Sequence, residues 1–153
     1  MSSETTDRGR RGNSVEVHSD LGEPPSWVEA LREYVLQALS ALDVRNSEVA
    51  IRLMDDEHIQ ELNRRFRSRD EVTDVLSFPG TDTAYLGDIA IDLEQVRRQA
   101  TDLGIPFEQE VRRMTVHGVL HLCGYSHRSN DFATEPMLIL QEELLTKHEE
   151  PLF

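Results

Sequence analysis

The segment from Phe107 to Gly124 constrains the fold of this chain more than any other part of its sequence. Its apolar residues recur at helical spacing, Pro106 stands where a helix can begin, and Gly124 stands where one can end. One apolar stripe of this segment is expected in the core, and it consists of Val111, Met114, Val119 and Leu122. The sequence therefore predicts a helix with one face in the core.

Two histidines of this helix, His117 and His121, are four residues apart, so their imidazoles lie on one face within reach of one ion. Gly124 can adopt the positive φ that ends the helix and turns the chain back, which lets His127 approach the same point. Three neutral imidazoles around Zn²⁺ leave the fourth tetrahedral position to water, as in catalytic zinc sites. We therefore predict that His117, His121 and His127 bind one zinc ion per chain. The remaining histidines have no partner at ligand spacing and are expected on the surface: His18, His58 and His148.

The spacing H-x-x-x-H-x-x-G-x-x-H is also that of the metzincin peptidases. Those enzymes need a glutamate directly after the first histidine, as the general base for the zinc-bound water. Gly118 occupies that position here. The sequence thus keeps the metal geometry without the peptidase base, which argues against proteolysis.

Strand and helix patterns are interspersed along the chain. Alternating apolar residues predict strands at 15–17, 49–53, 75–78 and 86–91. Further helices are predicted at about 26–42, 55–66, 92–104 and from 131 or 134 to 147, with Ser26 and Glu29 as a capping box and with Asp55 and Asp92 as caps. Residues 1–13 are polar and predict a disordered tail. We expect residues 14–153 to form a single α+β domain, a small mixed sheet covered by helices with a zincin-like three-histidine site.

Charge and cysteine content restrict the class of protein. The 153 residues include 29 acidic and 16 basic side chains, and this net charge of −13 argues against a general nucleic-acid binder but allows a local basic patch. No apolar run is long enough for a transmembrane helix, and residues 1–14 lack the apolar stretch of a secretory signal. The single cysteine, Cys123, excludes an internal disulfide. We therefore expect a cytoplasmic protein with no membrane partner.

The densest basic cluster consists of Arg64, Arg65, Arg67 and Arg69. An arginine fork grips phosphate with two hydrogen bonds, so a patch beside the metal can bind an RNA backbone. The alternative is a solvated helix end, where the helix dipole also favours arginine.

Asp74 and Asp88 stand within strand-like segments, and either can orient a ligand histidine or a water molecule. Hydrogen bonding at a turn or a sheet edge is the alternative for both. Cys123 is expected to point away from the metal and into the core. Met137 either floors the metal site or packs in a helix interface.

Three stretches of the sequence resemble one family of proteins. HGVLHLCGYSH at 117–127 is similar to the signature H-G-x-L-H-L-x-G-Y-D-H of the bacterial YbeY-type endoribonucleases, the rRNA maturation factors. LNRRFRSRDEVTDVLSFP at 62–79 and LGDIAI at 86–91 are similar to the second and third motifs of the family. The resemblance covers roughly residues 47–145. Two departures are Ser126 at a usual aspartate and Val72 at a common proline.

This resemblance implies a zinc-dependent hydrolase that cleaves single-stranded RNA. It implies maturation of the 3′ end of the small-subunit rRNA and ribosome quality control, with ribosomal proteins and a ribosome-associated GTPase as partners. Its catalytic residues fall on Arg67 and His117, and its zinc ligands on His117, His121 and His127. The alternatives are a non-enzymatic assembly factor with structural zinc and, against the evidence of Gly118, a metallopeptidase.

Overall fold

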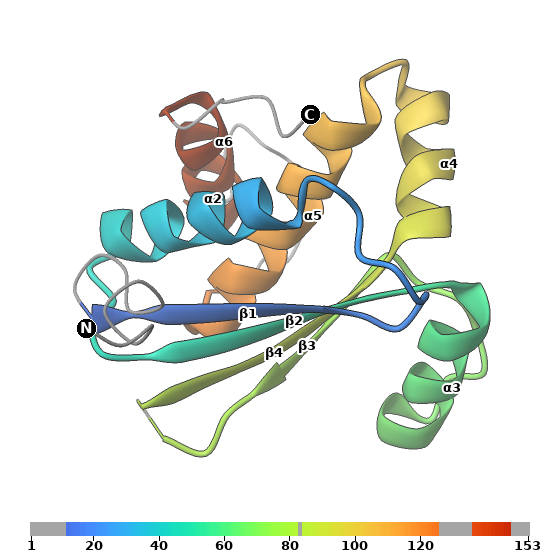
Figure 1. The fold of residues 1–153 in the computed structure, drawn as a ribbon, viewed down its shortest axis with the longest axis horizontal. Helices are drawn as coiled ribbons and strands as arrows, with labels where there is room; N and C mark the ends of the chain where they lie inside the picture. Colours follow the sequence, from blue (N-terminus) through green and yellow to red (C-terminus); the bar gives the residue numbers. More distant parts are fainter. Residues whose placement is uncertain (1–11, 83, 126–135, 148–153) are drawn as a thin grey trace.

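The computed structural model describes residues 12–82, 84–125 and 136–147, which form a mixed sheet with helices on both faces (Figure 1). The strands are β1 (Ser14–Ser19), β2 (Glu48–Met54), β3 (Val75–Pro79) and β4 (Tyr85–Asp92). The helices are α2 (Val28–Ala41), α3 (Asp56–Arg67), α4 (Leu93–Leu103), α5 (Phe107–Leu122) and α6 (Pro136–Lys147). The predicted α+β class is confirmed, and each predicted strand and helix is found, although the predicted start of the last helix, at 131 or 134, lies outside the described residues.

The four strands lie in the order β1-β2-β4-β3. β1 and β4 run parallel to β2, whereas β3 pairs antiparallel with β4. Side chains alternate between the faces of a strand, so the fully buried Ile51 and Ile89, which are register partners, point to one face. Arg52 and Asp88 point to the opposite face. The sheet therefore separates an apolar layer from a second face that carries charge.

Helix α5 lies at the centre of the apolar layer, between the sheet and α6 (Figure 1). The predicted stripe of α5 packs into the main core, and Trp27 meets Phe107 edge to face, with ring centroids 6.3 Å apart. The far side of α5 forms a second cluster with α2 and α6: Tyr34, Val116, Leu120, Met137 and Leu144. Burial on both sides fixes the direction in which the remaining face of α5 points.

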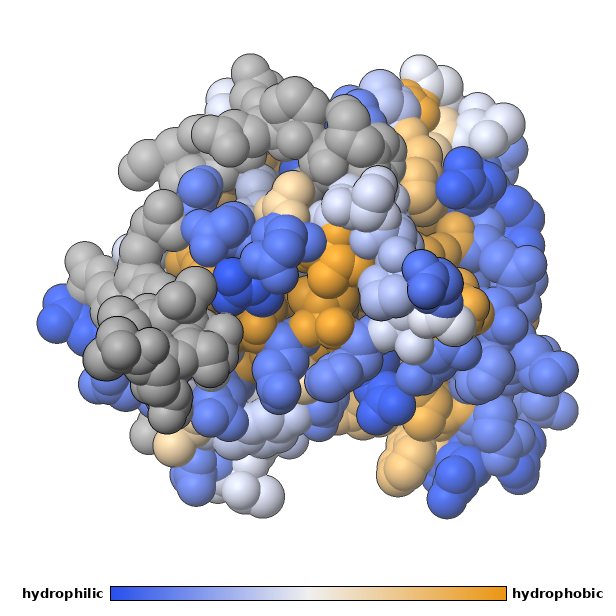
Figure 2. Space-filling view, in the orientation of Figure 1, coloured by the Kyte–Doolittle hydropathy of each residue, from blue (hydrophilic) through white to orange (hydrophobic). Residues whose placement is uncertain are grey.

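Helix α3 lies on the other face of the sheet, at the lower right of Figure 1. It is held there by a small cluster of Met54, Ile59 and Ala90. Hydrophilic side chains predominate on the right-hand side of Figure 2, where α3 and α4 lie. The basic end of α3 is therefore at the surface, next to the edge strand β3.

The predicted helix caps are confirmed at two helices and wrong at one. Asp55 accepts a hydrogen bond from the backbone N–H of His58, and Asp92 accepts one from Glu94, both at 3.0 Å. The capping box at Ser26 is absent because α2 begins one residue later, with Trp27 as an N-cap that makes no side-chain bond. The N-cap residue Trp27 packs on Phe107, and Glu29 pairs with Arg32, at 2.9 Å.

The described part of the chain begins just inside the segment predicted as a tail. Residues 1–11 lie outside the described residues, whereas Asn13 is fully buried. Its side chain donates to the carbonyl of Val44 at 2.8 Å and accepts from the backbone N–H of Ser47 at 3.1 Å. The chain is thus packed from Asn13 onward.

None of the described helices is long and apolar enough to cross a membrane.

One acidic side chain, Asp92, is fully buried at the start of α4. Burial, with the neighbouring carboxylate of Asp56 as a further cause, raises the pKa of Asp92 to about 7. Asp56 itself is bound by Arg98 at 2.8 and 3.0 Å, which lowers its pKa. The folded protein therefore binds a proton at Asp92 more tightly than the unfolded chain does.

This shift makes stability depend on pH with a defined sign. The protonated Asp92 stabilises the fold fully at low pH, and this contribution is lost as the pH rises through about 7. Asp92→Asn keeps an N-cap acceptor without a charge, so its melting temperature should fall less than that of the wild type between about pH 5 and about pH 8. Thermal melting of both proteins across this range tests it, and parallel curves would contradict the shift.

Candidate active site

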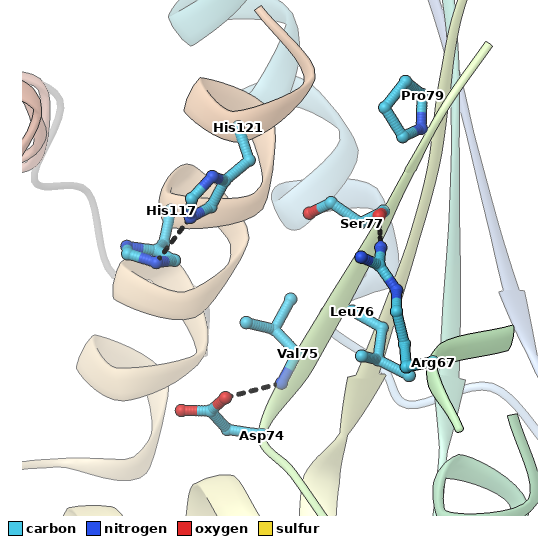
Figure 3. A pocket seen from close by; sticks show the side chains of 8 residues that line it. All are labelled: Arg67, Asp74, Val75, Leu76, Ser77, Pro79, His117 and His121. Carbon is cyan, nitrogen blue, oxygen red and sulfur yellow. Dashed lines mark hydrogen bonds between the residues drawn. The ribbon is translucent and has the colours of Figure 1, made fainter. Parts of the chain in front are cut away.

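A cavity of about 380 Å³ lies between α5 and the edge strand β3 (Figure 3). It brings together the end of α3, the length of β3 and two turns of α5. Its lining consists of Arg67, Asp74, Val75, Leu76, Ser77, Pro79, His117 and His121. The site therefore combines the two motifs that the sequence places about fifty residues apart.

His117 and His121 both point into this cavity from one face of α5 (Figure 3). Their Nε2 atoms are 3.0 Å apart, and their ring planes are inclined by 74°. Two tetrahedral zinc ligands with bonds of about 2.0–2.1 Å have nitrogens roughly 3.3 Å apart. This nitrogen pair thus has nearly the spacing that one bound zinc ion requires.

Gln141 of α6 fixes the orientation of His117, and sequence reasoning missed it. The Gln141 side chain is 1% exposed, and its Oε1 accepts a hydrogen bond from Nδ1 of His117 at 2.8 Å. With the proton on Nδ1, the Nε2 lone pair of His117 faces the cavity, as in most metal-bound histidines. The available signal is a polar residue in the apolar stripe that Met137 and Leu144 form on α6.

The third predicted ligand, His127, and the family departure at Ser126 lie outside the described residues. The turn that precedes them is described. Helix α5 ends at Leu122, Gly124 has a φ of 94°, and the N–H of Tyr125 bonds back to the carbonyl of Leu120 at 3.0 Å. The predicted helix end at Gly124 is therefore found, and the ligand role of His127 stays a prediction.

Arg67 reaches the cavity from the opposite side of the sheet edge. It is the last residue of α3, and its Nη2 donates to the carbonyl of Ser77 on β3 (Figure 3). Among the described residues no carboxylate forms an ion pair with it. A guanidinium has five N–H donors, so Arg67 retains both charge and donors for an anion.

The other arginines of the cluster are placed differently. Arg64 forms an ion pair with Glu61, and Arg69 forms one with Glu71 at 3.5 Å. Arg65 lies over the ring of Phe66, with its guanidinium carbon 5.6 Å from the ring centroid. Of the four arginines, only Arg67 lines the cavity of the histidines.

The two strand aspartates have different positions. Asp74 lines the cavity, and its Oδ1 accepts from the backbone N–H of Val75 at 2.7 Å, which is the sheet-edge alternative. Asp88 lies on the other face of the sheet and accepts from the hydroxyl of Tyr85. Burial and this hydrogen bond raise the pKa of the Tyr85 phenol. Asp88 is therefore not part of the histidine cavity.

Two further residues take structural positions. Cys123 packs against the main core, as predicted, and burial raises the pKa of its thiol to about 11. It is thus neither an activated nucleophile nor a ready thiolate ligand. Met137 is 1% exposed and packs in the cluster between α5 and α6, which confirms the helix-interface alternative.

The described residues also include a group of three carboxylates, from Asp56, Asp92 and Glu94, whose oxygens lie within 4.8 Å of one another. All three stand at the first turns of α3 and α4. Asp92 caps α4, Glu94 accepts from the N–H of Asp56 at 2.9 Å, and Arg98 binds Asp56. Helix capping and the arginine account for this cluster, and none of its members lines the histidine cavity.

At Gly118 the backbone of α5 lies close to strand β4. A Cβ built at this position would lie 2.9 Å from Cγ2 and 3.2 Å from Cδ1 of Ile89, which is fully buried. The Cβ at position 118 would point toward β4 and not into the histidine cavity. A glutamate at position 118 therefore has neither the room nor the orientation to act as a peptidase base.

This contact predicts a loss of stability on adding a single methyl group. Gly118→Ala should destabilise the fold by about 1–3 kcal/mol through overpacking, although alanine favours helices over glycine. Ile89→Val removes Cδ1 and should cost less in the Gly118→Ala background than in the wild type. Denaturant unfolding of the four proteins of this double-mutant cycle measures the coupling. Additive effects would show that α5 does not touch Ile89 at this position.

Comparison with known proteins places most of the chain in one family. The family model described as Endoribonuclease YbeY matches residues 16–149. A curated protein named Endoribonuclease YbeY from Persephonella marina is 36% identical over 138 residues, which cover 86% of this chain and 90% of that protein. One of the same name from a Sulfurihydrogenibium species is 39% identical over 140 residues, covering 88% and 92%.

A solved structure has the same fold. The solution structure of a Thermotoga maritima protein aligns with a TM-score of 0.66 at 28% identity, over 87% of each chain. The residues that the family model matches include the histidine helix, the edge strand and the arginine at the end of α3. The chain thus belongs to the Endoribonuclease YbeY family.

Proposed function

We propose that this member of an endoribonuclease family is a zinc-dependent hydrolase that cleaves single-stranded RNA in the cavity between α5 and β3. One observation carries the proposal: Arg67 and the histidine pair line the same cavity, although they come from different elements on different sides of the sheet edge. A metal cation held by the imidazoles would lie on one side of the cleft, and the Arg67 guanidinium lies on the other. The two are suited to bind one phosphodiester from both sides.

The histidines fit zinc better than a merely structural role. His117 and His121 present nitrogens 3.0 Å apart, and the buried Gln141 orients the first of them. We propose His127 as the third ligand, since the chain turns back after Gly124. When bound there, zinc would lower the pKa of a coordinated water toward 7 and stabilise negative charge on a phosphate oxygen.

In this mechanism Arg67 binds the scissile phosphate. Arg67 lines the cavity, and the bond to the Ser77 carbonyl holds its guanidinium in place. A donor fixed before the reaction stabilises developing charge without reorganisation. His117 has the second proposed catalytic role, through the ion that it helps to hold.

The biological substrate that we propose is ribosomal RNA in the cytoplasm. The resemblance to the rRNA maturation factors supports this substrate. On the same basis we propose that the protein acts in maturation of the 3′ end of the small-subunit rRNA and in ribosome quality control. Ribosomal proteins and a ribosome-associated GTPase are proposed partners on the same basis. The net charge of −13 requires that RNA binding depend on the local cations near Arg67 and not on the whole surface.

The zinc site predicts a graded series of variants. The purified protein should contain about one zinc ion per chain, and His121→Ala should lose it. Gln141→Leu should weaken zinc binding by about 10–100-fold, because the orientation of His117 is lost. His58→Ala is the control, since His58 bonds to Asp55 at 2.6 Å, away from the cavity. Metal analysis and chelator competition measure the series, and full zinc retention in His121→Ala would exclude this site.

We predict that removal of the Arg67 guanidinium lowers RNA cleavage and leaves the fold intact. Arg67→Ala should lower single-turnover cleavage of a single-stranded oligoribonucleotide by roughly 2–4 kcal/mol of transition-state stabilisation, with zinc content and melting temperature nearly unchanged. Arg67→Lys should restore activity only in part, because a point charge cannot replace a two-pronged fork.

Arg64→Ala is the matched control, since it removes the same charge one turn earlier on α3. It should weaken RNA affinity and its salt dependence only slightly, because Glu61 already pairs with Arg64. Wild-type cleavage by zinc-loaded Arg67→Ala would remove Arg67 from the site. Binding of rRNA without cleavage by the zinc-loaded wild type would favour the assembly factor, and robust peptide hydrolysis the metallopeptidase.

A further inference from the structure

We propose that a hollow lined by Phe66 and Phe78, outside the histidine cavity, is a stacking subsite for a nucleobase of the bound RNA strand. This inference rests on the proposed function, because it names how that substrate is held. The hollow has a volume of about 310 Å³ and lies on the face of the sheet that α3 partly covers. Its lining consists of Arg52, Leu62, Phe66, Phe78, Asp88, Ile89 and Ala90.

The exposure of Phe66 is not explained by packing of the fold. Its side chain is 60% exposed, the largest value among the large apolar residues in the described ranges. Leu62, one turn earlier on the same helix, packs against the small cluster around Ile59. Phe66 instead meets Phe78 edge to face, with centroids 5.6 Å apart and planes inclined by 70°. More than half of the surface of Phe66 therefore stays accessible to a ligand.

Two arginines without carboxylate partners in the described ranges flank these rings. Arg65 lies 5.6 Å from the centroid of Phe66, and Arg67 lies 5.2 Å from the centroid of Phe78. Exposed aromatic rings interleaved with cations are the combination that binds single strands, through base stacking and phosphate contacts. The lining itself holds one cation, Arg52, which pairs with Asp20, and one carboxylate, Asp88, so the charge that favours a polyanion comes from the two arginines over the rings.

Arg67 connects the two hollows. Its guanidinium lines the histidine cavity and also lies over the ring of Phe78, which lines the second hollow. A phosphate bound by Arg67 in the cavity therefore has an adjacent nucleotide beside Phe66 and Phe78. Because every base presents a flat π face, stacking there would hold a strand with little sequence preference. A paired base cannot reach the ring, which selects for single-stranded substrate.

The test is binding of a short single-stranded oligoribonucleotide by fluorescence anisotropy, with chelator present to prevent cleavage. Phe66→Ala and Phe66→Leu should both weaken binding by about 5–100-fold, and Phe66→Trp should bind at least as tightly as the wild type. The loss in Phe66→Leu distinguishes stacking from general apolar contact. Leu103→Ala is the control, because Leu103 is equally exposed, at 58%, but lies on α4.

A base-removal series makes the assignment specific. In a series of oligoribonucleotides, each with an abasic site at a different position, one position should weaken binding to the wild type most. At that position the abasic site should weaken binding to Phe66→Ala only slightly, because the stacking contact is already lost. The slope of log affinity against log salt should be unchanged in Phe66→Ala, whereas Arg65→Ala should reduce it by about one. Equal losses from base removal in the wild type and Phe66→Ala would overturn the subsite while the nuclease stands. Failure of the wild type to bind or cleave RNA at all would instead overturn the proposed function.

Discussion

The close approach of α5 to β4 at Gly118 is the contact on which the site depends. Because no side chain separates the helix from Ile89, α5 lies deep enough for its next face to stand against the edge strand β3. The hydroxyl of Ser77 bonds to the carbonyl of Gly118 at 3.4 Å, so the same glycine also joins the helix to that strand. The two imidazoles follow from this position, since His117 is the neighbour of Gly118. A residue that lacks a side chain thus decides where the chemistry-bearing side chains lie.

Much of this arrangement is a local property and was predictable. The spacing of His117 and His121 follows from the helical period, and the end of α5 follows from the ability of Gly124 to adopt a positive φ. Strand alternation likewise predicted a mixed sheet. These features need no information about distant parts of the chain.

The predictions that were wrong, and the residue that was missed, depend on contacts between residues far apart in the sequence. Gln141 bonds to His117 across 24 residues, and a buried polar residue in an apolar stripe reveals that it has a partner but not which one. The N-cap of α2 is Trp27, which packs on the distant Phe107 and makes no side-chain cap bond, a position that local capping rules do not predict. Asp88 was grouped with Asp74 because both stand within strand-like segments, but Asp74 precedes β3 and lines the histidine cavity, whereas Asp88 lies inside β4 and lines a hollow on the other face of the sheet.

The hydrogen bond from Arg67 to the carbonyl of Ser77 also affects the tendency of the protein to self-associate through its sheet edge. An unpaired edge strand is a template on which another chain can add, and β3 ends in a proline that limits such pairing. Arg67 occupies the Ser77 carbonyl and puts a cation on this edge, while Asp74 occupies the N–H of Val75. Two side chains that line the histidine cavity are thus also the ones that close the sheet edge. The catalytic role that we propose for Arg67 and the protection of this edge against self-association therefore fall on one position, and a substitution there would change both.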